Sequence, residues 1–365
     1  MCEQHDVVIV GGGVIGLSIA WELANRGREV CLLERGEPGR EASWAGAGML
    51  PDVPTDTDDA LEQLMAASRG LHEQWAQRLR EATGIDNGFH VNGALYLARS
   101  AGERASLRAW QRSCGEAGLD CSWLEPDEVL QFEPALSSDS LRGACRLPRE
   151  AQVRNPHHLQ ALTKACQQAG VAIRPQAPVV SLELEQGVCR TAQEAFQGSQ
   201  VCVAAGPWSR ELLAACDWTP DLYPVRGQIA LLRLPERIIT HTLNEGPRYL
   251  VPRRDGRVLA GSTEEEVGFD KSTTPEAIAE LTRFAYELAP ALREAEVERT
   301  WAGLRPAAFD GFPYLGRAPH LERIFVAAGH FRNGLTLSTG TAVLLAQLMC
   351  NEPPLVDPER FRVGR

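Results

Sequence analysis

Six residues near the start of the chain, Gly11-Gly12-Gly13-Val14-Ile15-Gly16, have the types and spacing that hold a dinucleotide. In the pattern G-x-G-x-x-G, Gly11 permits a tight turn, Gly13 lets the backbone approach a pyrophosphate, and Gly16 lets a helix pack close to a strand. Glu34 stands about 20 residues further on, where a carboxylate can accept hydrogen bonds from a ribose. These residues predict a site for FAD or NAD, and Glu34 disfavours NADP.

The elements around these residues are those that the chemistry requires. An apolar, β-branched run at 6–10 predicts a buried parallel strand, the apolar spacing from Val14 onward predicts a helix, and 30–33 predicts a second strand. A small-residue segment follows at 41–49 and is expected to form neither a core strand nor a good helix. It could be an ordinary flexible loop, but its position directly after the ribose-binding strand favours a wrap around the cofactor.

Composition narrows the possible functions. The chain has 365 residues and a formal net charge of -11, which argues against nucleic-acid or anionic-membrane partners. No run of 18 apolar residues is present and the first strand begins at Asp6, so we expect no membrane span and no signal peptide, and a cytoplasmic location. The 10 cysteines show no C-x-x-C pair and no metal-ligand spacing, so no metal site is expected. The adjacent pair His157-His158 is expected to serve as a helix cap or surface feature rather than as ligands.

The middle of the chain does not continue a βαβ series. A long amphipathic helix at 60–83 is followed by a strand, two helices and, later, by strands at 223–234 and 249–261, the latter folding back through a hairpin turn at 254–257. The sequence therefore predicts an α/β fold with two interleaved domains. One is a Rossmann-type nucleotide domain formed by 1–85, 150–220 and 306–365. The other is an α+β substrate domain with an antiparallel sheet, formed by 86–149 and 221–305.

The end of the chain repeats the arrangement of its beginning. A strand at 323–329 leads through His330-Phe331-Arg332-Asn333-Gly334-Leu335 into a helix at 336–349. A helix N-terminus with several free N–H groups is therefore expected to face a ligand that bears or develops negative charge.

Taken together, the motifs resemble the glycine oxidase and D-amino-acid oxidase group of flavoenzymes. The resemblance extends over nearly the whole chain and rests on 11–16 with Glu34, and on 47–49, 204–209, 249–253, 301–306 with 310–311, and 329–334. It implies non-covalent FAD, and a cysteine that covalent-flavin sarcosine oxidases carry near 304–306 is missing. The residues that it implies along the cofactor are Val14, Ile15, Glu34, Arg35, Ala42, Ser43, Ala47, Gly48, Met49, Val179, His330, Arg332, Asn333, Gly334, Leu335 and Thr336.

The resemblance also implies a substrate site. Arg305 would hold the substrate carboxylate, with Tyr249 and Arg332 nearby. A guanidinium pairs with a carboxylate through two parallel hydrogen bonds, although from the residues alone a structural salt bridge is as good an interpretation of Arg305. Tyr249 could be an edge-strand aromatic, and Arg332 a surface or phosphate contact. Glu264 departs from the family pattern, because an apolar side chain is expected there.

The reaction implied is hydride transfer from a small amino acid, such as glycine, sarcosine, D-alanine or D-proline, to the flavin N5. It would give an imine or oxo acid, ammonia and, with dioxygen as the acceptor, hydrogen peroxide, and would serve thiazole and thiamin biosynthesis. A homo-oligomer, with a tetramer suggested by the family, is expected. The alternatives are a D-amino-acid dehydrogenase, a sarcosine or N-methyl amino-acid oxidase, a nicotinamide dehydrogenase, and an inert flavin-binding or RNA-modification module.

Overall fold

The apolar run at the start of the chain becomes the central strand of a largely parallel sheet. The structure is a computed structural model that describes residues 2–214, 216 and 218–365; Met1, Ala215 and Asp217, which the predicted nucleotide-domain ranges include, lie outside the described residues. The strands of this first sheet are β1 (Cys2–Val10), β2 (Val30–Leu33), β9 (Ala172–Arg174), β10 (Ser181–Glu183), β11 (Val188–Arg190), β12 (Ala195–Val203), β18 (Tyr314–Arg317) and β19 (Ile324–Ala328).

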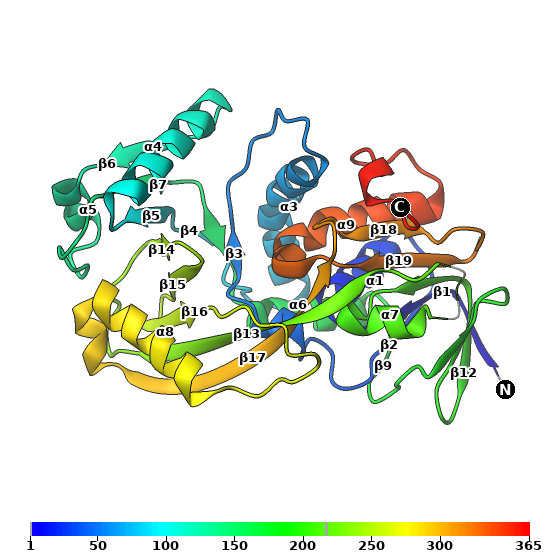
Figure 1. Ribbon diagram of the computed structural model, residues 1–365. Coiled ribbons are helices and arrows are strands. Elements are labelled where there is room, and N and C mark those ends of the chain that lie inside the picture. The colour runs from blue at the N-terminus through cyan, green and yellow to red at the C-terminus, as the bar shows by residue number, and fades with distance from the viewer. Residues whose placement is uncertain (1, 215, 217) are drawn as a thin grey trace.

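The parallel part of this sheet runs in the order β9-β2-β1-β12-β19. β2 and β19 are buried along their whole length, as are the last four residues of β1 and the last three of β12, in keeping with their continuous apolar sequences. The helices α1 (Val14–Asn25), α3 (Ala60–Thr83), α6 (Asn155–Gln168) and α9 (Gly334–Cys350) pack together over one face of the sheet (Figure 1). The glycine turn therefore joins a central strand to a helix, which confirms the predicted unit at 6–34.

The second sheet has the order β17-β13-β16-β15-β14-β5-β7-β6 and lies in the other half of the molecule (Figure 1). Its strands are β5 (Ala94–Ala98), β6 (Ser122–Leu124), β7 (Gly143–Leu147), β13 (Leu222–Arg233), β14 (Thr242–Glu245), β15 (Arg248–Pro252), β16 (Arg257–Gly261) and β17 (Glu296–Ala308). The helices α4 (Ala101–Glu116), α5 (Pro126–Phe132) and α8 (Pro275–Leu288) flank it. The predicted hairpin at 254–257 joins β15 to β16, which pair antiparallel.

One pair in this sheet corrects the expectation of a purely antiparallel sheet. β5 and β14 run parallel, with Leu95 opposite Leu243. These strands come from stretches of the chain that are far apart, so no short link dictates their direction, and local turn signals cannot predict it. The remaining pairs of this sheet are antiparallel.

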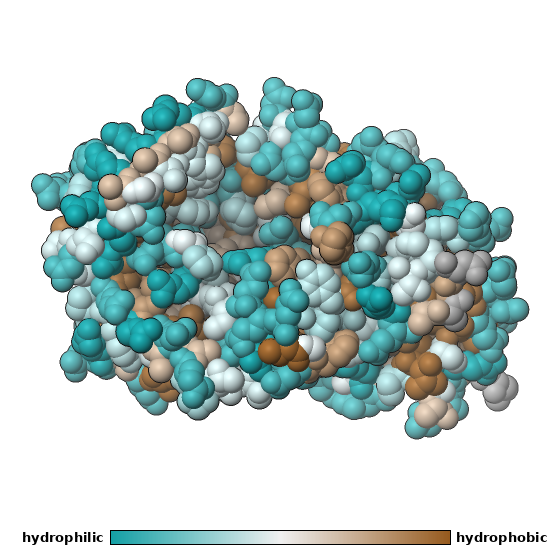
Figure 2. Space-filling view, viewed as in Figure 1, coloured by the Kyte–Doolittle hydropathy of each residue, from teal (hydrophilic) through white to brown (hydrophobic). Residues whose placement is uncertain are grey.

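A small third sheet lies between the two large ones. It consists of β3 (Met49–Leu50), β4 (His90–Val91) and β8 (Ala151–Gln152), with β8 in the middle. The face of the molecule in Figure 2 is mostly hydrophilic, and the hydrophobic side chains gather in separate patches and in the recess between the two halves. β13 and β17 extend from the second sheet toward this junction (Figure 1), and they carry side chains of the site described below.

Candidate functional site

The glycine turn and Glu34 form one hydrogen-bonded unit at the ends of β1 and β2. Glu34 Oε2 accepts a hydrogen bond of 2.7 Å from the Gly12 N–H, and Oε1 accepts one of 2.9 Å from the Gly36 N–H. Gly16 lies behind the turn, where a Cβ atom would stand 1.9 Å from the Gly11 carbonyl oxygen, so any other residue would push α1 off the strand. The buried carboxylate of Glu34 is thereby fixed beside the N-terminus of α1.

The segment 41–49 folds over this N-terminus and corrects one expectation. Ala42–Ala45 form a one-turn helix, α2, where no good helix was expected. Tertiary contacts supply what the local sequence does not: the Val14 N–H donates to Ser43 Oγ at 2.9 Å, and the Trp301 indole donates to the Ala45 carbonyl at 3.0 Å. The segment is therefore held between α1 and β17.

A second helix N-terminus opens onto the same region. α9 begins at Gly334, without a side-chain cap and without an acidic residue in its first turn. His72 Nε2 lies 3.0 Å from the Thr336 carbonyl oxygen, and this contact fixes the first turn of α9. His330 is buried with Nε2 at 3.2 Å from Thr341 Oγ1, and burial lowers the pKa of His330 to about 3, so the ring stays neutral.

Arg305 is a largely buried cation that has no carboxylate partner among the described residues. Its Nη1 donates to the Thr263 carbonyl at 3.1 Å and to the Arg226 carbonyl at 3.4 Å, and its Nη2 donates to Ser262 Oγ at 2.7 Å. Burial lowers the pKa of Arg305. The guanidinium lies flat on β13 because Gly227 has no side chain; a Cβ atom there would stand 2.2 Å from Nη2. A partly buried, unneutralised guanidinium favours an anionic ligand.

Tyr249 and Arg332 are the other two residues predicted for the substrate site. Tyr249 is buried on β15, and its ring covers Gly261 of the paired strand. Arg332 lies just before α9 and forms an ion pair with Glu264, with 2.9 Å between Nη1 and Oε2. Glu264, the residue that departs from the family pattern, is therefore the partner of one of the predicted site residues.

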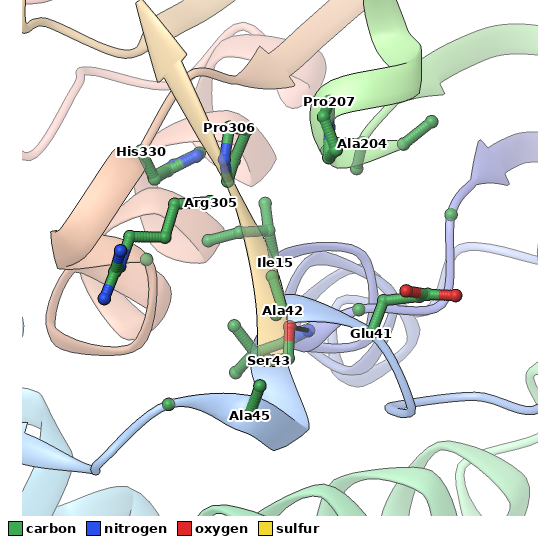
Figure 3. A pocket seen from close by; sticks show the side chains of 18 of the residues that line it. Ile15, Glu41, Ala42, Ser43, Ala45, Ala204, Pro207, Arg305, Pro306 and His330 are labelled. Atoms are coloured by element: carbon green, nitrogen blue, oxygen red, sulfur yellow. Dashed lines mark hydrogen bonds between the residues drawn. The ribbon is translucent and has the colours of Figure 1, made fainter. Parts of the chain in front are cut away.

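A single cavity of about 390 Å³ brings the predicted residues together. Figure 3 shows Arg305 and His330 on one side of it and Glu41, Ala204 and Pro207 on the other. Gly16 and Asn333 are not among the residues that line it. The predicted residues that do are Gly11, Gly13, Val14, Ile15, Glu34, Arg35, Ala42, Ser43, Ala47, Gly48, Met49, Val179, Tyr249, Arg305, His330, Arg332, Gly334, Leu335 and Thr336. These are positions in the fold, and the binding roles of the residues stay predictions.

Several residues at the cavity were not singled out from the sequence. Asn155 donates to the Ser43 carbonyl at 2.7 Å, and its buried Oδ1 has no hydrogen-bond partner among the described residues. Trp208 stacks against Arg35, whose guanidinium carbon is 3.4 Å from the ring centroid. Trp208 belongs to the 204–209 motif, which was the available signal. Asn155 is followed by Pro156, and this pair by itself signals only the start of a helix.

Arg253 fixes the backbone of two segments next to the cavity. It is buried and donates to the Ala47 carbonyl at 2.6 Å and to the Val153 carbonyl at 3.1 Å, and burial lowers its pKa to about 9.

The structure corrects the expectation for His158. This residue is completely buried and contacts Asn87 at 3.1 Å rather than capping a helix or facing solvent. Its neighbours come from elsewhere in the chain, so its own sequence position does not reveal its burial.

The donor groups of the cavity fit a long anionic dinucleotide. Two helix N-termini whose N-cap residues, Gly13 and Asn333, make no side-chain cap face it, and such ends bind phosphates and stabilise developing negative charge. Glu34 and Arg35 line the cavity together with the glycine turn, and Arg305 lines it as well, across from Glu41 in Figure 3. Among the described residues, no group of three or more His, Cys, Asp and Glu could hold a metal ion.

Comparison with known proteins decides the family. The family model for FAD-dependent oxidoreductases of the DAO type matches residues 6–348. The chain belongs to this FAD-dependent oxidoreductase family. Glycine oxidase of Geobacillus kaustophilus is 35% identical over 369 residues, covering 100% of this chain and 98% of that protein. The bifunctional protein ThiO/ThiG of Trichormus variabilis is 35% identical, covering 95% of this chain and 53% of that protein.

A solved structure confirms the fold class. The crystal structure of glycine oxidase from Geobacillus kaustophilus superposes with a TM-score of 0.94 at 34% identity, covering 100% of this chain and 99% of that one. The cofactor of this enzyme is therefore FAD, which is one of the two dinucleotides that the glycine turn and Glu34 predicted and the one that the resemblance implied; the nicotinamide alternative is excluded by the family. No described helix is long and apolar enough to cross a membrane.

Proposed function

We propose that this oxidoreductase catalyses the oxidative deamination of glycine and other small amino acids, with sarcosine, D-alanine and D-proline as the further candidates. The observation that carries the proposal is Arg305, a largely buried guanidinium that lines the cavity and has no carboxylate partner among the described residues. The relatives of this chain that are named glycine oxidase support the choice of glycine.

Arg305 has the hydrogen-bond capacity to bind a carboxylate. A guanidinium has five N–H groups. Nη1 donates to the Thr263 and Arg226 carbonyls and Nη2 to Ser262 Oγ, so two of the five N–H groups are left over. The edge of the guanidinium formed by Nε and Nη2 would then bind a carboxylate through parallel hydrogen bonds. This would fix both the position and the orientation of the substrate.

The rest of the site would orient the substrate and stabilise charge. When bound, FAD would supply the acceptor for a hydride from the α-carbon and the route for its electrons to dioxygen. The N-terminus of α9 would stabilise negative charge that develops at the far side of the cavity. His330 is a weak base near neutral pH, because burial lowers its pKa to about 3. In the proposed reaction the lone pair of the neutral amine would drive the transfer, without a proton accepted by His330.

Several finer predictions belong to the same proposal. Glycine, dioxygen and water would give glyoxylate, ammonia and hydrogen peroxide, and the product would serve thiamin biosynthesis, which the ThiO/ThiG relatives support. FAD would be held non-covalently, since none of the cavity-lining residues is a cysteine. The two large sheets support the division into a nucleotide domain (1–85, 150–220, 306–365) and a substrate domain (86–149, 221–305). A cytoplasmic location and a homotetramer remain predictions.

The test is the visible spectrum of the anaerobic protein before and after glycine, sarcosine, D-alanine, D-proline and L-alanine are added separately. We expect glycine to bleach the flavin bands, and air to restore them with formation of hydrogen peroxide. A flavin that these amino acids reduce but that air reoxidises slowly, and a quinone analogue rapidly, would favour a D-amino-acid dehydrogenase. A flavin that none of them reduces would refute the proposed substrates while leaving the family in place.

A further inference from the structure

The segment that follows β16 places Glu264 on the same side as Arg305. This segment continues to pair with β13, because the Arg226 N–H donates to the Glu265 carbonyl at 2.8 Å and the Glu265 N–H donates back at 3.0 Å. Successive side chains of an extended segment point to opposite sides. Ser262 contacts Arg305 at 2.7 Å, so Glu264, two residues later, lies on the Arg305 side.

The side chains on the other side of the segment have different partners. Thr263 Oγ1 accepts from the Gln228 N–H at 2.9 Å, and Glu265 Oε1 accepts from the Gln228 side chain at 2.8 Å. Glu265 also forms an ion pair with Arg226. The alternation therefore separates two neighbouring carboxylates: Glu265 neutralises a structural arginine, whereas Glu264, which is exposed, is left to pair with a residue at the edge of the cavity.

The partner of Glu264 is Arg332, which lines the cavity. Glu264 Oε2 lies 2.9 Å from Arg332 Nη1, and the two side chains are 49% and 38% exposed. The charges also act on Arg305: its pKa is lowered chiefly by burial and further by Arg332, whereas Tyr249 and Glu264 raise it. The edge of the cavity thus holds a neutralised arginine next to the unneutralised Arg305.

We propose that Glu264 is a specificity-determining residue that restricts the site to amino acids with a single carboxylate. By pairing with Arg332 it removes the second positive charge that a dicarboxylic substrate needs, and its own carboxylate repels a second anionic group. Arg305 then provides the charge for the one α-carboxylate. This proposal rests on the proposed function, because it names the class of amino acid that the same site accepts.

Sarcosine and iminodiacetate form a matched pair for the test, because they differ by one carboxylate on the N-methyl carbon. We expect the wild-type enzyme to prefer sarcosine. In Glu264→Gln, Arg332 loses its partner, and the ratio of kcat/KM for iminodiacetate to that for sarcosine should rise about tenfold or more, while kcat/KM for sarcosine changes by less than about threefold. The rise should shrink at high salt, since the pair is half exposed.

Two variants separate this effect from a general loss of charge. Glu266→Gln removes the same charge from an exposed position two residues away and should leave the ratio unchanged. Adding Arg332→Gln to Glu264→Gln should abolish the gain with iminodiacetate. Binding of glycolate and malonate, measured by isothermal titration calorimetry, should show the same order without turnover: Glu264→Gln should gain affinity for malonate and not for glycolate.

The possible failures are distinguishable. If the wild type oxidises glycine and Glu264→Gln leaves both the substrate ratio and malonate binding unchanged, the proposal for Glu264 is overturned and the proposed function stands. A wild type that already uses iminodiacetate as well as sarcosine would overturn it too. If the wild type oxidises none of these amino acids, the proposed function fails, and the malonate and glycolate titrations still decide whether Glu264 sets the charge that the cavity accepts.

Discussion

Two arginines on paired strands show how differently the two faces of one sheet are used. Arg226 lies on β13 and Arg305 on β17, where Val225 is opposite Arg305 and Arg226 is opposite Leu304. Arg226 forms ion pairs with Glu265 and Asp270, and its side chain is only 5% exposed. Arg305 has only neutral acceptors among its described neighbours and lines the cavity.

The difference separates stability from function. A buried cation with two carboxylates is a complete structural unit, whereas a buried cation with carbonyl and hydroxyl partners retains unbalanced charge. The fold tolerates that charge at Arg305 because the polar groups around it are hydrogen-bonded and Gly227 gives the guanidinium room. We therefore expect substitution of Arg305 to affect substrate binding and substitution of Arg226 to affect the fold.

The largest effect is expected for Arg305→Leu, which removes the carboxylate-binding group. The value of kcat/KM for glycine should fall about 10³-fold, because a hydrogen-bonded charge pair in a desolvated site contributes about 2–5 kcal/mol. The flavin spectrum and the melting temperature should change little. Arg305→Lys keeps the charge but loses the planar arrangement of N–H groups, so its kcat/KM for glycine should lie between that of the wild type and that of Arg305→Leu. An unchanged KM for glycine in Arg305→Leu would contradict the comparison.

Low pH can obscure the comparison, because the fold itself should weaken there. Burial lowers the pKa values of His72 to about 4 and of His158 and His330 to about 3, from 6.5. The stability they contribute is complete above pH 6.5 and is lost as the pH falls toward these folded-state values. Each should lose on the order of 2 kcal/mol between pH 7 and pH 5.

One carboxyl group acts in the opposite direction. Burial raises the pKa of Glu150 to about 7 from 4.5, so its protonation stabilises the fold as the pH falls, offsetting about one histidine. Melting temperatures measured at pH 5, 6, 7 and 8 should therefore decline on the acid side, and mutant comparisons belong at pH 7 or above. Equal melting temperatures at pH 5 and pH 7 would show that the three histidines are not held neutral.

Arg226→Gln should destabilise the protein by about 1–3 kcal/mol, because it leaves Glu265 without its cationic partner while both carboxylates are partly exposed. Urea denaturation measures the change. Arg283→Gln is the matched control, since among the described residues Arg283 pairs only with Glu287, at 4.0 Å, and both side chains are exposed. If Arg226→Gln instead raised the KM for glycine as strongly as Arg305→Leu, the division between structural and functional arginines would be wrong.

The smallest effect is expected for Gly227→Ala. The added methyl group would stand 2.2 Å from Nη2 of Arg305, so the guanidinium must shift away from the strand. The KM for glycine should rise about tenfold, since a displaced binding group loses much of its effect. Gly70→Ala, where a Cβ atom meets nothing within 4 Å, should leave the kinetics unchanged. Equal KM values for both variants would show that the position of Arg305 is not critical.

The sequence by itself determined the features that depend on neighbouring residues. The glycine turn, Glu34, the long helix at 60–83 and the hairpin at 254–257 follow from spacing and turn chemistry within short windows, and the structure has each of them. The resemblance indicated the family, and the structure brings most of the site residues that it implied to one cavity. Such features are predictable because the interactions that specify them lie close together in the chain.

Only the tertiary structure decided which side chains meet across the chain. The helix α2 depends on Val14 and Trp301, and the parallel pairing of β5 with β14 depends on strands that no short turn connects. The sequence left open whether Arg305 had a carboxylate partner and what Glu264 faced; the first has none among the described residues, and the second pairs with Arg332. Ion pairs and burial are set by residues tens or hundreds of positions apart, and no local pattern encodes which of them come into contact.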